Sequence, residues 1–261
     1  MKLATWNVNS LKVRLPHVLD WLMSNQPDVL CLQETKQEDS RFPIAELSEA
    51  GYQAVFSGQK TYNGVAIISK VAAAETAYGL PNFPDAQKRM IAATIDSIRM
   101  VCVYVPNGQS VDSEKYNYKL AWLSALQAWL KNELLHFPQL VLLGDFNIAP
   151  EDRDVYDPQA WRGNVLVSAP ERAAFNGLLQ LGLHDSFRLF EQPGNAYSWW
   201  DYRMMAFRRN MGLRIDHILL SSTLAASCQA CSIDHSPRKL ERPSDHAPVV
   251  AELKDFCSSP P

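Results

Sequence analysis

Carboxylate and amide residues follow buried apolar runs at several separate places in the chain. Asn7 and Asn9 follow the run Leu3–Trp6, and Glu34 follows the run Val29–Leu32. The same pattern recurs at Asn107, Asp145, Asn147, Asp216 and Asp245. Residues at strand ends tend to line the functional crevice of α/β sheets. Because Asp, Glu and Asn offer the oxygen ligands that hard cations prefer, the pattern indicates a site for Mg²⁺ or Mn²⁺.

Two of these groups are pairs spaced by two residues, Asn7 with Asn9 and Asp145 with Asn147. In an extended backbone, residues i and i+2 point the same way, so each pair is expected to present two polar groups to one site. Taken alone, an Asp at a strand end is more often a turn or cap residue. Carboxylates gathered without a cation would repel one another, so the recurrence favours a cation site over many separate turns.

His246 follows Asp245 in an irregular segment framed by prolines and a serine. A histidine that is hydrogen-bonded to a buried carboxylate is held in one tautomer and stays protonated more readily. His246 is therefore the candidate for a general base or for a cationic partner of phosphate. His217 neighbours Asp216, but in a strand it points to the opposite face, so we expect it to pack rather than react.

Strands and helices must position these side chains, and the chain contains many short apolar runs that are typical of buried strands. The predicted strands are Leu3–Trp6, Val29–Leu32, Tyr52–Ser57, Gly64–Ser69, Ile91–Ile95, Met100–Val105, Leu140–Leu143, Ile218–Leu220 and Pro248–Ala251. Apolar stripes and capping signals predict helices at Leu15–Ser24, from a cap at Ser113 to about Leu135, and from the capping box Ser168–Glu171 to Gly182. Because several strands follow one another directly, we expect mixed, mostly antiparallel sheets flanked by helices.

Length and composition favour one globular α/β domain. The chain has 261 residues, 47% of them hydrophobic and 20% charged, and we expect a single domain over residues 1–254 with a frayed tail at 255–261. The net charge of −3 restricts any nucleic-acid binding to a local basic patch. No apolar run approaches the roughly 20 residues of a membrane helix. Five scattered cysteines are typical of a reducing compartment, so a cytoplasmic monomer without membrane association is expected.

Six ordered motifs now carry a resemblance that covers about residues 1–254. They are Trp6–Leu11, Leu32–Lys36, Tyr104–Gly108, Leu143–Asn147, Leu213–His217 and Ser244–Pro248. With these motifs the chain resembles the exonuclease III family of DNA-repair nucleases, within the endonuclease/exonuclease/phosphatase superfamily. The resemblance implies a four-layer α/β (α+β) sandwich, in which two mixed sheets lie face to face with helices outside.

The resemblance also implies an activity. This would be Mg²⁺-dependent hydrolysis of phosphodiesters in duplex DNA, with Mn²⁺ able to replace Mg²⁺. The DNA would carry damaged, recessed or abasic sites. Members of the family act as 3′→5′ exonucleases, remove blocked 3′ ends and often cut at abasic sites.

The residues that match the family's site are the following. Glu34 matches the main metal ligand, with Asn7 and Asp245 nearby. Asp145 matches the residue that positions or activates the attacking water, assisted by Asn147, and both are expected to face the metal. Asp216 and His246 match an Asp–His pair with His246 toward the phosphate, while Tyr104 and Asn107 match phosphate-contacting residues.

A basic segment, Tyr202–Arg214, is the candidate DNA-binding loop. It contains no acid and four arginines, Arg203, Arg208, Arg209 and Arg214. Trp199, Trp200 and Phe207 lie in or beside it, and a basic loop with aromatic residues can straddle a phosphate backbone. Solvated arginines are the commoner explanation of such a run, but its position matches the family's minor-groove loop. Further backbone contacts are expected from Lys60, Lys88, Arg89, Arg238, Lys239 and Arg242.

Two positions bear on abasic-site cleavage. Trp199 and Ile215 match walls of the pocket that holds a flipped-out sugar in family members that cut at abasic sites. Leu213 stands where a tryptophan is frequent, and Val165–Val167 is bulky where small or polar residues often border that pocket. The resemblance therefore favours 3′-end activity over abasic-site cleavage.

Three alternatives remain open from the sequence. A superfamily phosphatase or phosphodiesterase acting on a small or lipid phosphoester would share the metal site, but it would want a basic pocket or an apolar hairpin. A binding module without catalysis would be expected to lack one of Glu34, Asp145, Asp216 or His246. A redox protein built on Cys228 and Cys231 is disfavoured, and so is a zinc site, because a zinc site needs a second pair.

Overall fold

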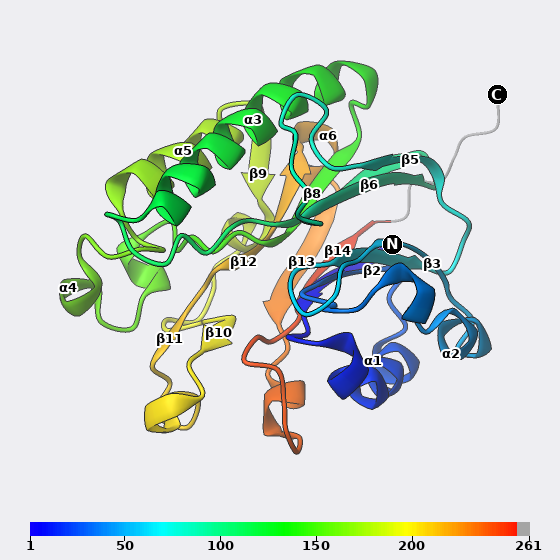
Figure 1. Ribbon diagram of the computed structural model, residues 1–261, viewed down its shortest axis with the longest axis horizontal. Coiled ribbons are helices and arrows are strands. Elements are labelled where there is room, and N and C mark those ends of the chain that lie inside the picture. Colours follow the sequence, from blue (N-terminus) through cyan, green and yellow to red (C-terminus); the bar gives the residue numbers. More distant parts are fainter. Residues whose placement is uncertain (255–261) are drawn as a thin grey trace.

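Two six-stranded sheets pack face to face in the protein, whose computed structural model describes residues 1–254 (Figure 1). The first sheet has the order β13 (Cys228–Ile233), β14 (Val249–Leu253), β1 (Lys2–Asn7), β2 (Val29–Gln33), β4 (Val65–Ser69), β3 (Gln53–Ser57). The second has the order β5 (Ala74–Tyr78), β6 (Met90–Ile95), β7 (Ile98–Tyr104), β8 (Leu140–Asp145), β12 (Asp216–Ser221), β9 (Leu183–Asp185). A separate two-stranded ribbon pairs β10 (Trp199–Trp200) with β11 (Gly212–Leu213).

Both large sheets are mixed. Strands β1 and β2 run parallel, as do β7 and β8, whereas the other neighbouring strands of these sheets are antiparallel. Since a parallel pair aligns equivalent strand ends, the ends of β1 and β2 meet at one edge, and those of β7 and β8 do the same in the other sheet. The predicted class, mixed and mostly antiparallel sheets flanked by helices, is confirmed.

Helices cover the outer face of each sheet and complete four layers (Figure 1). Helices α1 (Leu11–Asn25) and α2 (Ile44–Glu49) cover the first sheet, and α3 (Glu114–His136) and α5 (Ala169–Leu179) cover the second. The short helices α4 (Pro158–Trp161) and α6 (Ser222–Ala225) do not belong to these layers. Residues such as Cys31, Ile67, Ile91 and Val141 fill the core between the sheets. Separate clusters lie beneath α1 and α2 and beneath α3 and α5. This burial of apolar surface on both faces fixes the sheets that carry the polar strand ends.

The helix signals were largely correct. The Ser113 side chain accepts a hydrogen bond from the Tyr116 amide at the start of α3, and both bonds of the predicted capping box are present in α5. Helix α1 begins at Leu11, four residues before the predicted start. The periodicity missed its first turn because exposed Lys12 and half-buried Arg14 interrupt the apolar stripe there.

Three edge strands of the large sheets, β5, β9 and β13, were not predicted from the sequence. Most positions of β5 and β13 are exposed or half-buried, and each contains a register irregularity, while β9 has only three residues, so all three give little apolar signal. Strand β13 holds Cys228 and Cys231, which are free thiols, and Cys231 is buried against the Ser186 hydroxyl. Among residues 1–254 no helix is long and apolar enough to cross a membrane. The expected tail at 255–261 lies outside the described residues.

Candidate active site at the edge of the two sheets

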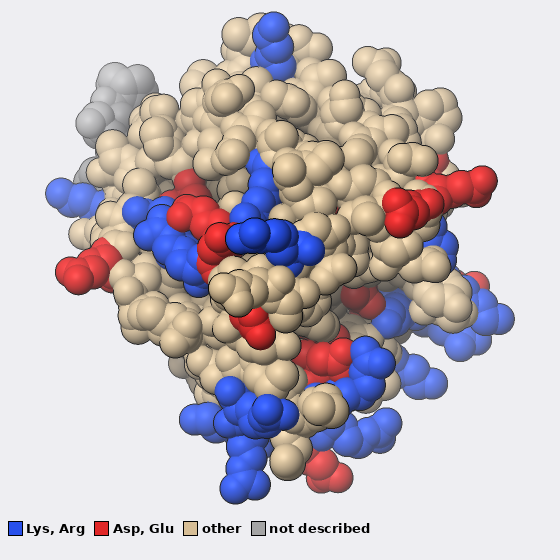
Figure 2. Space-filling view, turned by 90° about the vertical axis from the view of Figure 1, so that its left-hand side faces the viewer, with Lys and Arg blue, Asp and Glu red and all other residues tan. Residues whose placement is uncertain are grey.

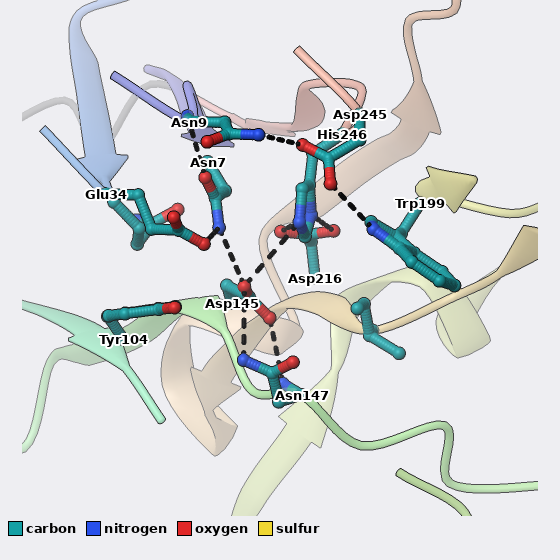
Figure 3. A network of polar contacts seen from close by, with 12 residues as sticks. Asn7, Asn9, Glu34, Tyr104, Asp145, Asn147, Trp199, Asp216, Asp245 and His246 are labelled. Carbon is teal, nitrogen blue, oxygen red and sulfur yellow. Dashed lines mark hydrogen bonds and ion pairs between the residues drawn. The ribbon is translucent and has the colours of Figure 1, made fainter. Parts of the chain in front are cut away.

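The polar strand ends of both sheets meet at one edge of the sandwich (Figure 3). Asn7 ends β1 and Glu34 directly follows β2, its parallel neighbour. In the other sheet, Tyr104 and Asp145 end the parallel strands β7 and β8 in register, and Asp216 begins β12 opposite Asp145. Four of the motifs meet because two pairs of parallel strands end at the same edge, and the antiparallel neighbours β12 and β14 bring the start of β12 and the segment before β14 to that edge.

Glu34, Asp145 and His246 form the centre of this site. One ligand atom from each lies within 4.8 Å of the other two. The Asn7 side-chain amide donates hydrogen bonds of 2.9 Å to both Glu34 Oε1 and Asp145 Oδ2, so it bridges the two carboxylates. Two carboxylates this close, with a buried amide between them, form a donor set that suits a hard divalent cation.

Asp245 is linked to that centre by a chain of hydrogen bonds through Asn9 and Asn7. Its Oδ1 accepts from Asn9 Nδ2 at 2.9 Å, and its Oδ2 accepts from the Trp199 indole at 3.1 Å (Figure 3). The Asn9 backbone amide in turn donates a hydrogen bond to Asn7 Oδ1. Asp245 therefore contacts the two carboxylates only indirectly, through Asn9 and Asn7.

The two i and i+2 pairs converge for a reason other than the one predicted. Asn9 and Asn147 both have left-handed backbones, with φ of 44° and 50°, and their backbone amides donate to the side chains of Asn7 and Asp145. Glu34 has φ of 51°. Non-glycine residues in this region are uncommon and cluster at functional sites. Tight turns, not extended strands, therefore bring each pair together.

Asp145 is buried, with His246 and Asp216 beside it. Burial, opposed by the charge of His246 and reinforced by that of Asp216, raises the pKa of Asp145 to about 7. His246 Nε2 lies 3.8 Å from Asp145 Oδ2, and its Nδ1 lies 2.9 Å from Asp216 Oδ2. Although burial opposes the charge of His246, the carboxylates of Asp216 and Asp145 outweigh it and raise the pKa of His246 to about 10. The predicted Asp216–His246 pair is present, and His246 is a cation at neutral pH.

Tyr104 and Asn107 border the same centre. Burial, together with the negative charges of Glu34 and Asp145, raises the pKa of the Tyr104 phenol well above its usual value, so the hydroxyl keeps its proton. Asn107 Nδ2 donates to Asn147 Oδ1 at 3.0 Å. A groove of about 730 Å³ runs past Tyr104 and Asn107 and is also lined by Tyr62 and Lys115.

Sequence reasoning missed two cations that hold this centre. Lys36 Nζ lies 2.8 Å from Glu34 Oε2 and donates to Asn9 Oδ1. The Arg89 guanidinium lies 4.8 Å from the centre of the Tyr104 ring and donates to the Tyr104 carbonyl. Lys36 lies inside the motif Leu32–Lys36, and Arg89 was expected to contact DNA. No local sequence signal predicts that Lys36 pairs with Glu34 or that Arg89 holds Tyr104.

The basic segment lies at one end of the molecule. Figure 2 shows Lys and Arg gathered at the lower end of the molecule, where Figure 1 shows both the turn between β10 and β11 and the segment between β13 and β14. Arg203, Arg208 and Arg209 are exposed, and Arg203 pairs with Asp201 at 2.6 Å. This surface can meet a phosphate backbone next to the site.

Two arginines assigned to DNA contacts are buried instead. Arg214, between β11 and β12, is 1% exposed and pairs with Asp154 at 2.6 Å and Asp185 at 2.8 Å. Arg238 is buried over the Phe207 ring, 4.8 Å from its centre. Both expectations were wrong, since net positive composition does not reveal which arginines have buried partners.

The two residues expected to wall an abasic-site pocket, Trp199 and Ile215, pack against a small apolar cluster. Ile215 is 1% exposed and shares a small cluster with Leu166, Val167 and Leu213, while Trp199 is half-buried beside it. Leu166 and Val167 are buried in this cluster, and Val167 also lines a cavity of about 360 Å³ beside Trp161. His217 behaves as predicted, because it is buried against Phe146 and bonds to the Ile148 carbonyl.

A sandwich of two sheets with paired carboxylates, a bridging amide and an Asp–His pair at one edge defines a hydrolase of phosphate esters. Residues 4–246 match the Endonuclease/Exonuclease/phosphatase family. The chain belongs to this family and, within it, to the exonuclease III-type nucleases, which hydrolyse phosphodiester bonds.

Three similar proteins support that assignment. Exodeoxyribonuclease III of Haemophilus influenzae is 37% identical over 97% of this chain and 100% of its own length. The 3′ phosphatase NExo from Neisseria, solved with a product DNA hairpin, is 50% identical, covers 98% of this chain and 100% of its own, and superposes with a TM-score of 0.96. An AP endonuclease from Archaeoglobus fulgidus is 41% identical over 98% of this chain and 100% of its own, with a TM-score of 0.94.

Proposed function

We propose that the protein is a metal-dependent DNA-repair nuclease that works at the 3′ ends of duplex DNA, removing nucleotides in the 3′→5′ direction and clearing blocked 3′ ends. The observation that carries this proposal is the cluster of Glu34, Asp145 and His246 at the sheet edge. The likeness to a 3′ phosphatase at 50% identity supports the preference for 3′ ends. The exposed arginines beside the site favour DNA over a small or lipid phosphoester.

The residues present fit a divalent cation, Mg²⁺ with Mn²⁺ able to replace it. Glu34 and Asp145 would hold the ion, with Asn7, Asn147 and, through Asn9, Asp245 around it. When bound, such an ion neutralises charge that develops on phosphate oxygens. The carboxylates of half-buried Glu34 and buried Asp145, bridged by the Asn7 amide, are the basis of this assignment, because they offer the oxygen ligands that such a cation prefers.

The chain's own side chains would carry the proton and the charge. Asp145 is buried, so its carboxylate is a strong acceptor for the proton of an attacking water. Cationic His246, held by Asp216, would face the phosphate oxygens and stabilise their increasing negative charge. The Tyr104 hydroxyl and the Asn107 amide would donate to the same phosphate, which fixes it for attack.

Three duplex substrates test the proposal with Mg²⁺ present. One has a recessed 3′-hydroxyl end, one a 3′-phosphate end, and one an internal abasic analogue. We expect digestion of the first and phosphate release from the second, with slower incision of the third. Asp145→Asn protein is the matched negative control. If neither 3′-end substrate reacts, the proposed function is wrong.

Incision at abasic sites is the second candidate activity. The similarity to an AP endonuclease at 41% identity and the position of Trp199 favour it. Leu166 and Val167 are buried in the cluster with Ile215, and a cavity of about 360 Å³ is open beside Val167, so their bulk does not by itself close a pocket. If incision proceeds as fast as 3′-end digestion, the preference for 3′ ends is wrong while the nuclease assignment holds.

Glu34→Gln should weaken metal binding more than it impairs the chemical step. The amide keeps the size of the side chain but removes a negative ligand, so the Mg²⁺ concentration for half-maximal activity should rise by about 10- to 100-fold. Excess Mg²⁺ should then restore most of the rate, and a chelator should abolish it. Titration calorimetry with Mn²⁺ measures the metal affinity independently of nuclease activity. Glu46→Gln, on exposed α2, is the control, and an unchanged Mg²⁺ requirement would contradict Glu34 as a ligand.

Arg208→Ala and Arg209→Ala should weaken duplex binding without lowering kcat at saturating DNA. Removing one side chain that binds a phosphate should reduce the slope of log affinity against log salt by about 1. Fluorescence anisotropy with labelled duplex at several salt concentrations measures this slope. Lys131→Ala on the outer face of α3 is the matched control. If the salt dependence of binding is unchanged in both arginine variants, Arg208 and Arg209 do not contact DNA phosphates.

A further inference from the structure

Lys119 and Glu171 form a buried ion pair beneath the active site. Lys119 lies on α3 and Glu171 on α5, and both side chains are 0% exposed. The Lys119 ammonium donates to the Glu171 carboxylate, to the Asn147 carbonyl at 2.7 Å and to the Asn107 carbonyl at 3.1 Å. An ammonium has three donors, so each finds one of these acceptors. Both carbonyls are backbone groups, and the side chains of these two asparagines lie in the candidate site.

The Glu171 carboxylate also has hydrogen-bond donors besides Lys119. Its carboxylate accepts hydrogen bonds of 3.0 Å from the backbone amides of Leu166 and Ser168, and it also accepts from the Ser168 hydroxyl. Leu166 has a left-handed backbone with φ of 76°, so these bonds fix an otherwise unfavourable turn. The pair therefore connects the segment before α5 with the loops after β7 and β8.

The Lys119 contacts extend to the centre of the site. Asn107 Nδ2 donates to Asn147 Oδ1, and Asn147 Nδ2 lies 3.4 Å from Asp145 Oδ2. Asn147 is itself left-handed, so a donor on its carbonyl helps hold the turn that aims its amide at Asp145. Gly108 packs against the Lys119 stem, where an added Cβ would lie 3.2 Å from the Lys119 Cδ. The stem and the ammonium thus both contact the loop after β7.

Stability alone does not account for a charged pair at this position. A buried ion pair is often no more stabilising than apolar residues of the same volume, because both charges lose their hydration. Lys119 contacts two loop carbonyls that an apolar residue would leave without a donor. By contrast, Arg99 on β7 pairs with Glu133 near the other end of α3, and its remaining donors go to the Glu75 carbonyl and the Thr94 hydroxyl, which lie outside the site.

We propose that Lys119, neutralised by Glu171, is a positioning residue that holds Asn107 and Asn147 in place for phosphate binding and for the orientation of Asp145. The proposal rests on the proposed function of this site. Small displacements of positioned groups are costly in catalysis, so loss of the ammonium should lower kcat by about 10- to 100-fold. The KM for DNA should change much less, because the exposed arginines supply that affinity.

The test compares Lys119→Met with the double variant Lys119→Met/Glu171→Gln. The single variant leaves a buried carboxylate without a cation, so its Tm should fall by roughly 10 °C. The double variant removes that charge and should regain most of the Tm, but the two carbonyls still lack their donor. We expect kcat on the 3′-end substrate to stay low in both. Recovery of kcat together with Tm in the double variant would show that the pair is only structural and would overturn the proposal.

Two further variants keep the test decisive. Arg99→Met should lower the Tm but leave kcat unchanged, which separates general destabilisation from loss of positioning. If the double variant does not fold, Lys119→Arg replaces it, because a planar guanidinium keeps the charge but cannot match an ammonium's bonds to both carbonyls. Wild-type kcat in that variant would overturn the proposal, and a lowered kcat at wild-type Tm would support it. Wild-type protein inactive on every DNA substrate would instead overturn the proposed function.

Discussion

Asp145→Asn protein should be folded and almost inactive. We expect kcat on a recessed 3′ end to fall by about 10⁴-fold, the upper end of the effect of one general acid or base. The loss of kcat should reach this upper limit because Asp145 has two roles, accepting a proton and facing the cation beside Glu34. The substitution keeps the size of the side chain, so the loss is chemical.

The same substitution should leave the Tm equal to or above that of the wild type. Burial, only partly opposed by His246, raises the pKa of Asp145 to about 7, so the ionised carboxylate disfavours the folded state. The amide removes that charge. Single-turnover digestion and a thermal melt measure the two effects on one sample, with Asp20→Asn on exposed α1 as the control. Activity within tenfold of the wild type would rule out Asp145 as the acceptor.

Much of the fold was predictable because its signals are local. Buried strands such as β4 and β8 are continuous apolar runs, and Ser113 and Ser168 cap helices through contacts within a few residues. Edge strands β5 and β13 have exposed residues and irregular registers, so they give no such run. The limit is therefore physical, since a strand held mainly by its neighbour needs little hydrophobic pattern of its own.

The candidate site was predictable as a set of residue types but not as a geometry. Polar residues after apolar runs identified Asn7, Glu34 and Asp145, and the parallel strand pairs explain why they meet. The turns that aim their neighbours use left-handed backbones at Asn9 and Asn147, which residue alternation does not predict.

The supporting charges could not be predicted because their partners are distant in sequence. Lys119 bonds to Glu171, 52 residues away, and Arg214 bonds to Asp154, 60 residues away. Sequence alone did not distinguish Arg214 from the exposed Arg208, since both lie in one basic segment. Only the buried partners of Arg214, Asp154 and Asp185, separate the two arginines, and that is why this DNA contact was assigned wrongly.

His246→Gln should lower kcat by about 10²- to 10³-fold, the usual cost of removing one donor to a developing oxyanion. Because His246 is cationic through Asp216 and Asp145, its loss removes a full charge from the phosphate site. It also leaves buried Asp216 without its cation, which should cost about 3–5 kcal/mol of folding stability. The expected result is therefore a slow enzyme that also melts earlier than the wild type.

Asp216 has no contact with the phosphate in this scheme and acts through the ring that it holds at 2.9 Å. The double variant His246→Gln/Asp216→Asn should therefore regain Tm but be no slower than His246→Gln, because groups that act as one unit are not additive. Single-turnover rates and thermal melts of the four proteins in this cycle measure both effects. If the two kcat losses multiply, Asp216 has a role of its own, and the positioning role assigned to it is wrong.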